Sequence, residues 1–406
     1  MANSNALTNA ISKRLSKHRL FYVCRDLERA TGSHLNLKNF FIITNKTRHA
    51  EEMAAKHTNI FLITNPTALD TSELLESAQT KKIIQPKDFI LVFKNNVIIE
   101  KICQRNSWRL LNPPAHLAET VESKITQITW LGRLAKYLPP HDVHICEQIP
   151  WQNQKFILQF NHSHTGGGTF LIDTKSKLND LKNKFPKRPV RTMTYIKGPV
   201  FTNNNLVWGN KIFIGNISYQ ITGIPPFTNH AFATVGNDWG LPHTMLSKKQ
   251  LQQYNHIVRA VGTKLKKSGW KGLFGVDVIQ HEKTGQLYLL EINARQPAST
   301  TFESELQSVQ NPSKTTLFDA HLAALLGIVP QHKPLTIIQT GAQIVQRVTA
   351  TAPKTITLQH PSILHIIYYP NTALGSDLIR IQCNESIMKK HNKFNSLGTK
   401  ISKSIC

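Results

Sequence analysis

The chain has 406 residues, of which 40% are hydrophobic, and it carries a formal net charge of +25. This length and apolar content exclude general disorder and allow two or three structural units with a sizeable shared core. The apolar runs fall short of the roughly 18 residues that cross a bilayer, and the first twenty residues lack the apolar block of a secretory signal.

The five cysteines are scattered along the chain without a Cys-x-x-Cys pair. This usage indicates a reducing, cytoplasmic location and argues against a metal–thiolate site. The first twenty residues hold no acid and carry Leu7, Ala10, Ile11 and Leu15 at a weakly helical spacing. We interpret them as a leading helix, with a transit peptide as the alternative.

A positive charge of this size steers anions toward the protein and strengthens weak binding to nucleic acid or anionic membranes. The charge is not concentrated in one arm of the chain. Residues 386–406, which contain lysines and no acid, form the only distinct basic run. We interpret this run as a solvated tail.

Residues 20–110 alternate between short apolar runs and helical segments, which predicts a small parallel sheet. The predicted strands cover residues 40–45 (FFIITN), 59–65 (NIFLITN), 88–94 (DFILVFK) and 97–100 (VIIE). The predicted helices cover residues 46–56 and 71–78. No Gly-x-Gly-x-x-Gly follows the early strands, so a dinucleotide fingerprint is missing.

A long helix is predicted from Ala115 onward, after Pro113-Pro114. Its apolar stripe is formed by Leu117, Val121, Ile128, Leu131 and Ala135. Lys124 falls in the middle of this stripe, and a lysine on an inward face needs an anionic partner to keep its proton. That partner is either a nucleotide phosphate or a protein acid.

Residues 155–172 predict two strands around a glycine-rich turn, in which Gly166, Gly167 and Gly168 let backbone N–H groups curl toward an anion. A strand follows at 191–201, and further strands lie within 206–223. We interpret the polar segment 227–242 as a substrate-side loop. Ser247 begins a helix with an apolar stripe that ends at Gly269 and serves core packing.

The segment 272–300 predicts two strands, Leu273–Gln280 and Leu287–Asn293, joined by a polar turn. Because side chains alternate along a strand, Asp277 points away from Val276 and Val278. By the same alternation, Glu291, Asn293 and Arg295 point away from Tyr288, Leu290 and Ile292. Two carboxylates this close need a cation, and oxygen ligands suit Mg²⁺, with Mn²⁺ as a possible substitute. The alternative is that the acids pair with nearby lysines.

The pattern GVDVIQ…LYLLEINAR resembles the metal-binding end of the ATP-grasp superfamily, which places an acid on one strand and Glu-x-Asn on the next. The resemblance implies a fold of α/β plus α+β class in three parts. These are an N-terminal α/β pre-ATP-grasp domain (residues 1–111), an ATP-grasp domain (112–330, small lobe about 130–200) and a C-terminal β-rich unit with a basic tail (331–406). The last part resembles that of biotin-carboxylase-like members.

The resemblance also implies roles for individual residues. ATP and Mg²⁺ are the implied cofactors, with the metal held by Asp277, Glu291 and Asn293. Lys124, Gln159 and the glycines 166–168 lie where the family contacts phosphates, and the backbone of Thr194, Tyr195 and Ile196 lies where it reads adenine. The implied catalytic residues are Arg295, which would bind the substrate carboxylate, and Arg347, for which a surface arginine is the alternative.

Two positions depart from the family pattern. Gln159 stands where the family usually has a lysine, and the adenine-binding segment lacks the frequent glutamate. Glutamine can hydrogen-bond a phosphate oxygen but cannot neutralise it. His162 and His164 would compensate if protonated, or they are ordinary polar loop residues.

The implied function is an ATP- and Mg²⁺-dependent ligase that activates a carboxylate as an acyl phosphate for attack by an amine or another nucleophile. Its partners are small-molecule substrates, and a homodimer is common in this fold. A biotin-type carboxylase component is one alternative, although the chain has no Met-Lys-Met biotinylation signal. A non-catalytic ATP-binding protein that binds a polyanion such as RNA is the other, because the charge does not exclude nucleic acid.

Overall fold

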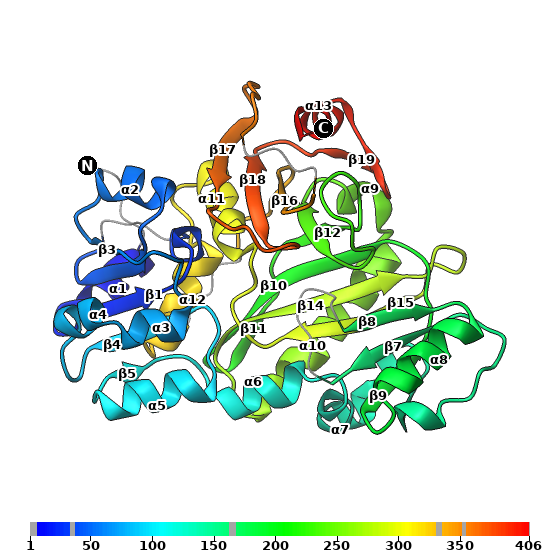
Figure 1. The fold of residues 1–406 in the computed structure, drawn as a ribbon. Helices are drawn as coiled ribbons and strands as arrows, with labels where there is room; N and C mark the ends of the chain where they lie inside the picture. The colour runs from blue at the N-terminus through cyan, green and yellow to red at the C-terminus, as the bar shows by residue number, and fades with distance from the viewer. Residues whose placement is uncertain (1–5, 33–36, 162–167, 330–334, 351–354, 406) are drawn as a thin grey trace.

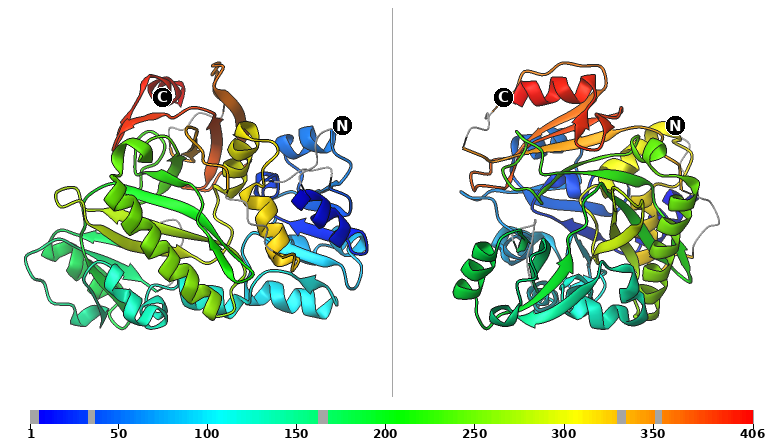
Figure 2. Two further views of the ribbon diagram at one scale, coloured as in Figure 1. Left: turned by 180° about the vertical axis from the view of Figure 1, so that it is seen from behind. Right: turned by 90° about the vertical axis from the view of Figure 1, so that its right-hand side faces the viewer.

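The computed structural model describes residues 6–32, 37–161, 168–329, 335–350 and 355–405 (Figure 1). These residues form a five-stranded, a four-stranded, a nine-stranded and a two-stranded sheet. The C-terminal segment lies at the top of both views in Figure 2, and the lobe with the four-stranded sheet lies at the bottom. No helix of the described residues is long and apolar enough to cross a membrane.

The N-terminal sheet is entirely parallel, with the strand order β3-β2-β1-β4-β5. Its strands are β1 (Leu20–Val23), β2 (Phe40–Asn45), β3 (Ile60–Ile63), β4 (Phe89–Val92) and β5 (Arg109–Leu110). The helices of this part are α1 (Ala6–Leu15), η1 (Leu27–Arg29), α2 (Arg48–Ala54), α3 (Thr71–Glu76), α4 (Ala78–Ile83) and α5 (Val97–Arg105). The predicted parallel sheet is therefore confirmed.

The predicted strand at residues 97–100 is wrong, because these residues begin α5. The side chain of Asn96 accepts a hydrogen bond from the Ile99 N–H and caps the helix at its start. The predicted leading helix is confirmed as α1. Leu7, Ile11 and Leu15 of that helix are fully buried.

The predicted long helix is also wrong. It is broken into α6 (Ala115–Glu122) and α7 (Thr126–Leu131), which is followed by η2 (Gly132–Tyr137). Lys124 lies in the non-helical link between α6 and α7, where its N–H donates to the Asn161 carbonyl at 3.1 Å. The next N–H, of Ile125, donates to Asn161 Oδ1 at 2.9 Å. These contacts with a distant residue outweigh the local helical pattern.

The four-stranded sheet has the order β6-β9-β7-β8 and its own small apolar core. Its elements are β6 (His141–Ile145), η3 (Cys146–Gln148), β7 (Phe156–Phe160), β8 (Thr169–Ile172), α8 (Lys175–Lys184) and β9 (Pro189–Thr194). The two predicted strands around the glycine turn are confirmed as β7 and β8. Within that turn, His162, His164, Gly166 and Gly167 lie outside the described residues.

The nine-stranded central sheet joins the middle of the chain to its C-terminal part. Its strands are β10 (Val200–Trp208), β11 (Lys211–Phe213), β12 (Ile217–Thr222), β13 (Thr234–Asp238), β14 (Gly272–Gln280), β15 (Leu287–Asn293), β16 (Ala342–Arg347), β17 (Ile363–Tyr368) and β18 (Asp377–Cys383). The helices around it are α9 (Pro242–Met245), α10 (Lys248–Lys267), α11 (Thr300–Gln310) and α12 (Leu317–Leu325). The helix predicted from Ser247 is confirmed as α10, which Ser247 caps.

The predicted loop at residues 227–242 contains a strand, β13, that lies inside the central sheet. It pairs with β12 on one side and with β16 on the other. Most of β13 is buried, so this part of the segment packs in the sheet and does not form a substrate-side loop. The pairing of β13 with β16 also makes the sheet continuous across residue 330, where the sequence predicts a domain boundary.

The basic C-terminal run is not a solvated tail. It forms β19 (Met388–Lys390), β20 (Lys393–Phe394) and α13 (Ser396–Ile405). Leu397, Ile401 and Ile405 are buried in the same apolar core as the central sheet, whereas the lysines of this run are exposed. The helix is amphipathic, a property that the lysine count of the run concealed.

The packing of α13 yields a stability prediction. Ile401 is fully buried, so Ile401→Ala should lower the free energy of unfolding by about 2–5 kcal/mol, because the substitution leaves a cavity. Lys403 is exposed on the same helix, and Lys403→Ala should change that energy by no more than about 0.5 kcal/mol. Urea denaturation measures both. An Ile401→Ala variant as stable as the wild type would contradict the packing of this helix.

Candidate functional site

Strands β14 and β15 pair in antiparallel fashion and place Asp277 directly opposite Glu291. Directly opposite residues of an antiparallel pair have their side chains on the same face of the sheet. Asn293 lies two residues further along β15, opposite Gly275. The predicted hairpin is therefore confirmed, and its two acids face each other.

A β-bulge in β15 decides which side chains reach this face. Asp277 pairs with Glu291, but the next residue, Val278, pairs with Leu289, so Leu290 is an extra residue. The bulge changes the predicted alternation. Leu287, Leu289 and Ile292 are the core residues of β15, whereas Tyr288 and Leu290, which were expected to share the face of Ile292, are half-buried and lie outside the core. Without the bulge, Leu289 and Glu291 would share one face.

Asp277 is buried and held by its neighbours on both sides. Thr202, its partner on β10, donates from Oγ1 to Asp277 Oδ1 at 2.5 Å, and Asn293 Nδ2 lies 3.4 Å from Oδ2. Burial, and next the nearby Glu291 carboxylate, raise the pKa of Asp277 to about 6. The pair therefore favours a cation, which would relieve both the burial cost and the repulsion.

Glu291 already has a cationic partner, because Lys124 Nζ lies 2.9 Å from its Oε1. Burial alone would raise the pKa of Glu291, but the charges of Lys124 and Arg295 outweigh it and lower that pKa. Of the two partners predicted for Lys124, the structure shows the protein acid. A phosphate contact of Lys124 stays a prediction.

Arg295 lies at the end of β15, on the same side as the acids. It donates to Asn293 Oδ1 at 2.7 Å and forms an ion pair with Glu122. Glu122 is also paired with Lys94 at 2.7 Å. The structure thus brings Asp277, Glu291, Asn293, Lys124 and Arg295, which were predicted separately, into one cluster, which we call the hairpin cluster.

The donor set of the hairpin cluster fits Mg²⁺ in type and number. It offers two carboxylates and an amide oxygen, and this metal usually binds one or two carboxylates together with substrate phosphates. Among the described residues, no group of three or more His, Cys, Asp or Glu side chains could hold a metal by itself. The residues present therefore fit a metal that is shared with a phosphate-bearing ligand.

Gln159 lies on β7, where it is bound to an arginine that the sequence analysis missed. Arg191 of β9 is its direct cross-strand partner and is fully buried. Burial lowers the pKa of Arg191 to about 10, and the Glu291 carboxylate acts in the opposite direction. One signal in the sequence could have indicated Arg191. It lies two positions before Met193 on a predicted strand, so the two side chains point to the same face.

The predicted adenine-binding segment joins the four-stranded sheet to the central sheet. Thr194 ends β9, and its N–H donates to the Pro140 carbonyl at 2.8 Å. Tyr195 and Ile196 follow in the connection to β10, and their backbone groups make no hydrogen bond with another described residue. Gly198 then packs so tightly that an added Cβ would lie 1.9 Å from the Gln280 carbonyl oxygen, which holds the connection against β14.

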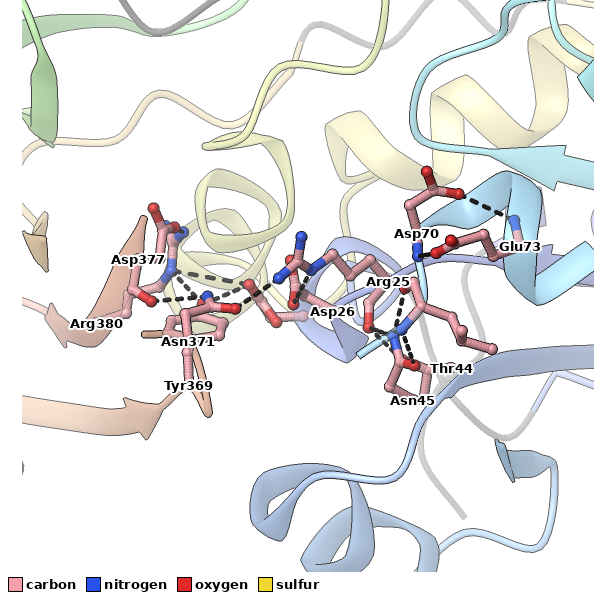
Figure 3. Close-up of polar contacts among 12 residues, drawn as sticks. Arg25, Asp26, Thr44, Asn45, Asp70, Glu73, Tyr369, Asn371, Asp377 and Arg380 are labelled. Carbon is pink, nitrogen blue, oxygen red and sulfur yellow. Dashed lines mark hydrogen bonds and ion pairs between the residues drawn. The ribbon is translucent and has the colours of Figure 1, made fainter. Parts of the chain in front are cut away.

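Arg347 lies apart from the hairpin cluster. It forms an ion pair with Asp377 and donates to the Thr234 carbonyl at 2.9 Å. Asp377 also binds Arg380 at 2.9 Å. Figure 3 shows Asp377 and Arg380 facing Arg25 and Asp26, which follow β1 at the carboxyl edge of the N-terminal sheet.

Contacts across this interface connect the N-terminal sheet with the C-terminal strands. Arg25 donates to Asn371 Oδ1 at 2.5 Å, and the Tyr369 hydroxyl donates to Glu28. Burial raises the pKa of Asp26 to about 7, with the Glu28 carboxylate as the next cause. Arg347 is connected to this interface through Asp377, and a catalytic role for it stays a prediction.

Residues 299–303, which follow Arg295 in the chain, are buried in the structure. Ser299, Thr301 and Glu303 are each less than 9% exposed. The carboxylate of Glu303 accepts hydrogen bonds from Asn204 Nδ2 at 2.6 Å and from the Asn216 N–H at 3.0 Å. Burial without a cation raises the pKa of Glu303 to about 7. These residues therefore pack in the interior.

No protein-family model matches the chain, and no curated protein is similar to it in sequence. Solved structures do match its fold. One is a carboxyaminoimidazole ribonucleotide synthase from Aspergillus clavatus, complexed with ATP, with a TM-score of 0.64 and 16% identity over 95% of this chain and 97% of the other.

Two further structures match over a similar length. An L-amino acid ligase from Bacillus licheniformis has a TM-score of 0.62 and 13% identity over 90% of this chain and 93% of the other. A phosphoribosylamine–glycine ligase from Thermotoga maritima has a TM-score of 0.63 and 13% identity over 96% and 97%. Likeness at these identities establishes the fold of the chain.

The burial of Glu303 yields a prediction for pH dependence. Its folded pKa of about 7 lies above that of an unfolded glutamate, about 4.3. The folded protein therefore binds more protons between these values, and its stability falls as the pH rises from about 4 to about 7. Glu303→Gln cannot titrate and should lose less stability than the wild type between pH 5 and pH 8.

Urea denaturation at both pH values measures this effect. The pH-dependent loss should differ between the two proteins by up to about 3 kcal/mol. Parallel stability curves would show that Glu303 keeps an ordinary pKa in the folded protein.

Proposed function

We propose that this chain, which has the ATP-grasp fold of the enzymes it resembles in structure, is an ATP- and Mg²⁺-dependent ligase that joins a carboxylate to an amine. The resemblance seen in the sequence is confirmed at the level of the fold. The observation that carries the proposal is the pairing of Asp277 with Glu291 on one face of the hairpin, beside Lys124. The names of the three solved neighbours, which are ligases or synthases, support it.

Phosphoryl transfer needs positioning and charge neutralisation more than covalent help from the protein. Asp277, Glu291 and Asn293 would hold Mg²⁺, which when bound neutralises the charge of the phosphates. Lys124 is buried next to Glu291 and would bind a phosphate oxygen of the nucleotide. The backbone groups of Tyr195 and Ile196, which make no hydrogen bond with another described residue, suit the hydrogen-bonding edge of adenine.

Arg295 has the side chain suited to the acid substrate, because its guanidinium can bind a carboxylate through two parallel hydrogen bonds. In the proposed reaction, a carboxylate oxygen forms a bond to the terminal phosphorus of ATP and ADP leaves. The amine nitrogen then attacks the acyl carbon, phosphate leaves, and the nitrogen loses a proton. Arg295 would stabilise the charge that develops on the carboxyl oxygens.

The two acids provide the first test of this function. Glu291→Gln and Asp277→Asn should each lower Mg²⁺-dependent ADP release by about 100-fold or more, because they remove ligand charge from the hairpin cluster. Asp180→Asn, on the exposed side of α8, is the matched control and should release ADP at the wild-type rate. Circular dichroism would verify that the fold is intact. Full turnover in either hairpin variant would refute the site.

The substrates require a screen of the wild-type protein. ADP release should be measured with Mg²⁺ across panels of carboxylates and amines, and again after removal of the metal with EDTA. We expect ADP release only when one acid, one amine and the metal are all present. Salt-sensitive RNA binding without ADP release under any pair would instead favour a non-catalytic polyanion-binding protein.

A further inference from the structure

Arg191 is a fully buried arginine without an acidic partner among the described residues. It is 0% exposed, and no carboxylate oxygen of a described residue lies within 4.0 Å of its guanidinium nitrogens, the limit for an ion pair. Its nitrogens donate instead to glutamine oxygens. Nε and Nη2 bind Gln159 Oε1 at 3.1 and 2.6 Å, and Nη1 lies 3.3 Å from Gln127 Oε1.

Neutral amide oxygens orient a guanidinium but do not neutralise it. A buried charge without a counter-ion is costly, so the fold retains Arg191 at the expense of stability. Both glutamines are themselves held in place. Gln159 Nε2 donates to Thr169 Oγ1 at 3.1 Å, and Gln127 Nε2 donates to the Val121 carbonyl at 2.8 Å. The arrangement fixes the position of a positive charge that no carboxylate of a described residue contacts within ion-pair distance.

The place of this charge is informative. Arg191 on β9 is the direct cross-strand partner of Gln159 on β7. Gln159 stands where the resemblance seen in the sequence implies a lysine, and the positive charge lies on the neighbouring strand, at Arg191. Gln159 then serves to hold the arginine. The histidines 162 and 164, which the sequence offers as compensation, are not needed for this explanation.

Arg191 also shares an acid with Lys124. The charge of the Glu291 carboxylate acts to raise the pKa of Arg191, and Glu291 Oε1 lies 2.9 Å from Lys124 Nζ. This step rests on the proposed function. If Glu291 held a divalent cation, its charge would compensate Lys124 and Arg191 less, and an incoming anion would take over that role.

We propose that Arg191 binds the phosphate chain of a nucleoside di- or triphosphate and supplies the positive charge that position 159 lacks. A guanidinium offers a planar fork of donors that matches two phosphate oxygens, which an ammonium group cannot do. Two of its five N–H donors have no hydrogen bond to a described residue. Arg191 therefore keeps donors for the phosphate while Gln159 and Gln127 hold its plane.

The experiment compares the binding of ADP with that of adenosine by isothermal titration calorimetry. Adenosine lacks the phosphates, so a residue that binds phosphate affects only ADP. Arg191→Gln should weaken ADP binding by about 10- to 100-fold and leave adenosine binding unchanged. Arg188→Gln, an exposed arginine just before β9, is the control and should change neither.

A charge-relocating variant keeps the test valid if Arg191→Gln folds poorly. The double variant Gln159→Lys with Arg191→Gln returns the positive charge to β7, and it should restore ADP affinity to within about threefold of the wild type. Arg191→Lys retains the charge without the planar fork and should fall between wild type and Arg191→Gln. Melting temperatures establish which variants are folded.

Three results would overturn the proposal. The first is unchanged ADP affinity in Arg191→Gln. The second is an equal loss for ADP and adenosine, which would indicate a purely structural role. The third is a wild-type protein that does not bind ADP. ADP binding that depends on Arg191 without ligase turnover would refute the ligase function and leave the phosphate-binding role of Arg191 standing.

Discussion

Two carboxylates on one face of a hairpin repel each other, and this repulsion organises the site. Asp277 and Glu291 are direct cross-strand partners, and burial increases the cost of their charges. Cations come to this pair from elements that are far apart in the chain. Lys124 comes from the link between α6 and α7, Arg295 from the end of β15, and Arg191 from β9 in the other sheet. The acids thus bring together elements that are far apart in the chain.

Irregular backbone places several of these groups. The β-bulge at Leu290 keeps Leu289 in the core and Glu291 on the site face. The break between α6 and α7 places Lys124 against Glu291. A regular strand and a continuous helix would each satisfy local preferences better, but they would not bring these side chains together. Irregular backbone is expected where the interactions gained between distant elements offset the local stability that is lost.

Positions 159 and 191 illustrate how a charge at one place can be supplied from either of two strands. Gln159 and Arg191 are neighbours across the sheet, so a charge on either strand lies close to the same place. The interface that contains Arg347 shows the opposite case. There Arg347 of β16 and Arg380 of β18 both bind Asp377, and Arg380 also pairs with Glu28 of η1, which connects the N-terminal part to the C-terminal strands.

Periodicity in the sequence was sufficient to predict the elements whose conformation is set by local interactions. The alternation along β14 and β15 predicted that Asp277 and Glu291 share a face, and the capped stripe after Ser247 predicted α10. The order of strands and helices, with the acid and Glu-x-Asn pattern, was enough to indicate the ATP-grasp fold. The alternating pattern of residues 20–110 likewise predicted their parallel sheet. The exception is residues 97–100, which begin the helix α5 that Asn96 caps.

Tertiary structure decided what depends on partners distant in the chain. Asn161 breaks the helix at Lys124, β12 and β16 recruit β13 into the sheet, and the central core buries α13. Arg191 carried no motif, and only its position opposite Gln159 shows what it faces. Periodicity reports which face of an element is buried, but the partner on that face is set by long-range contacts whose energies outweigh local preference.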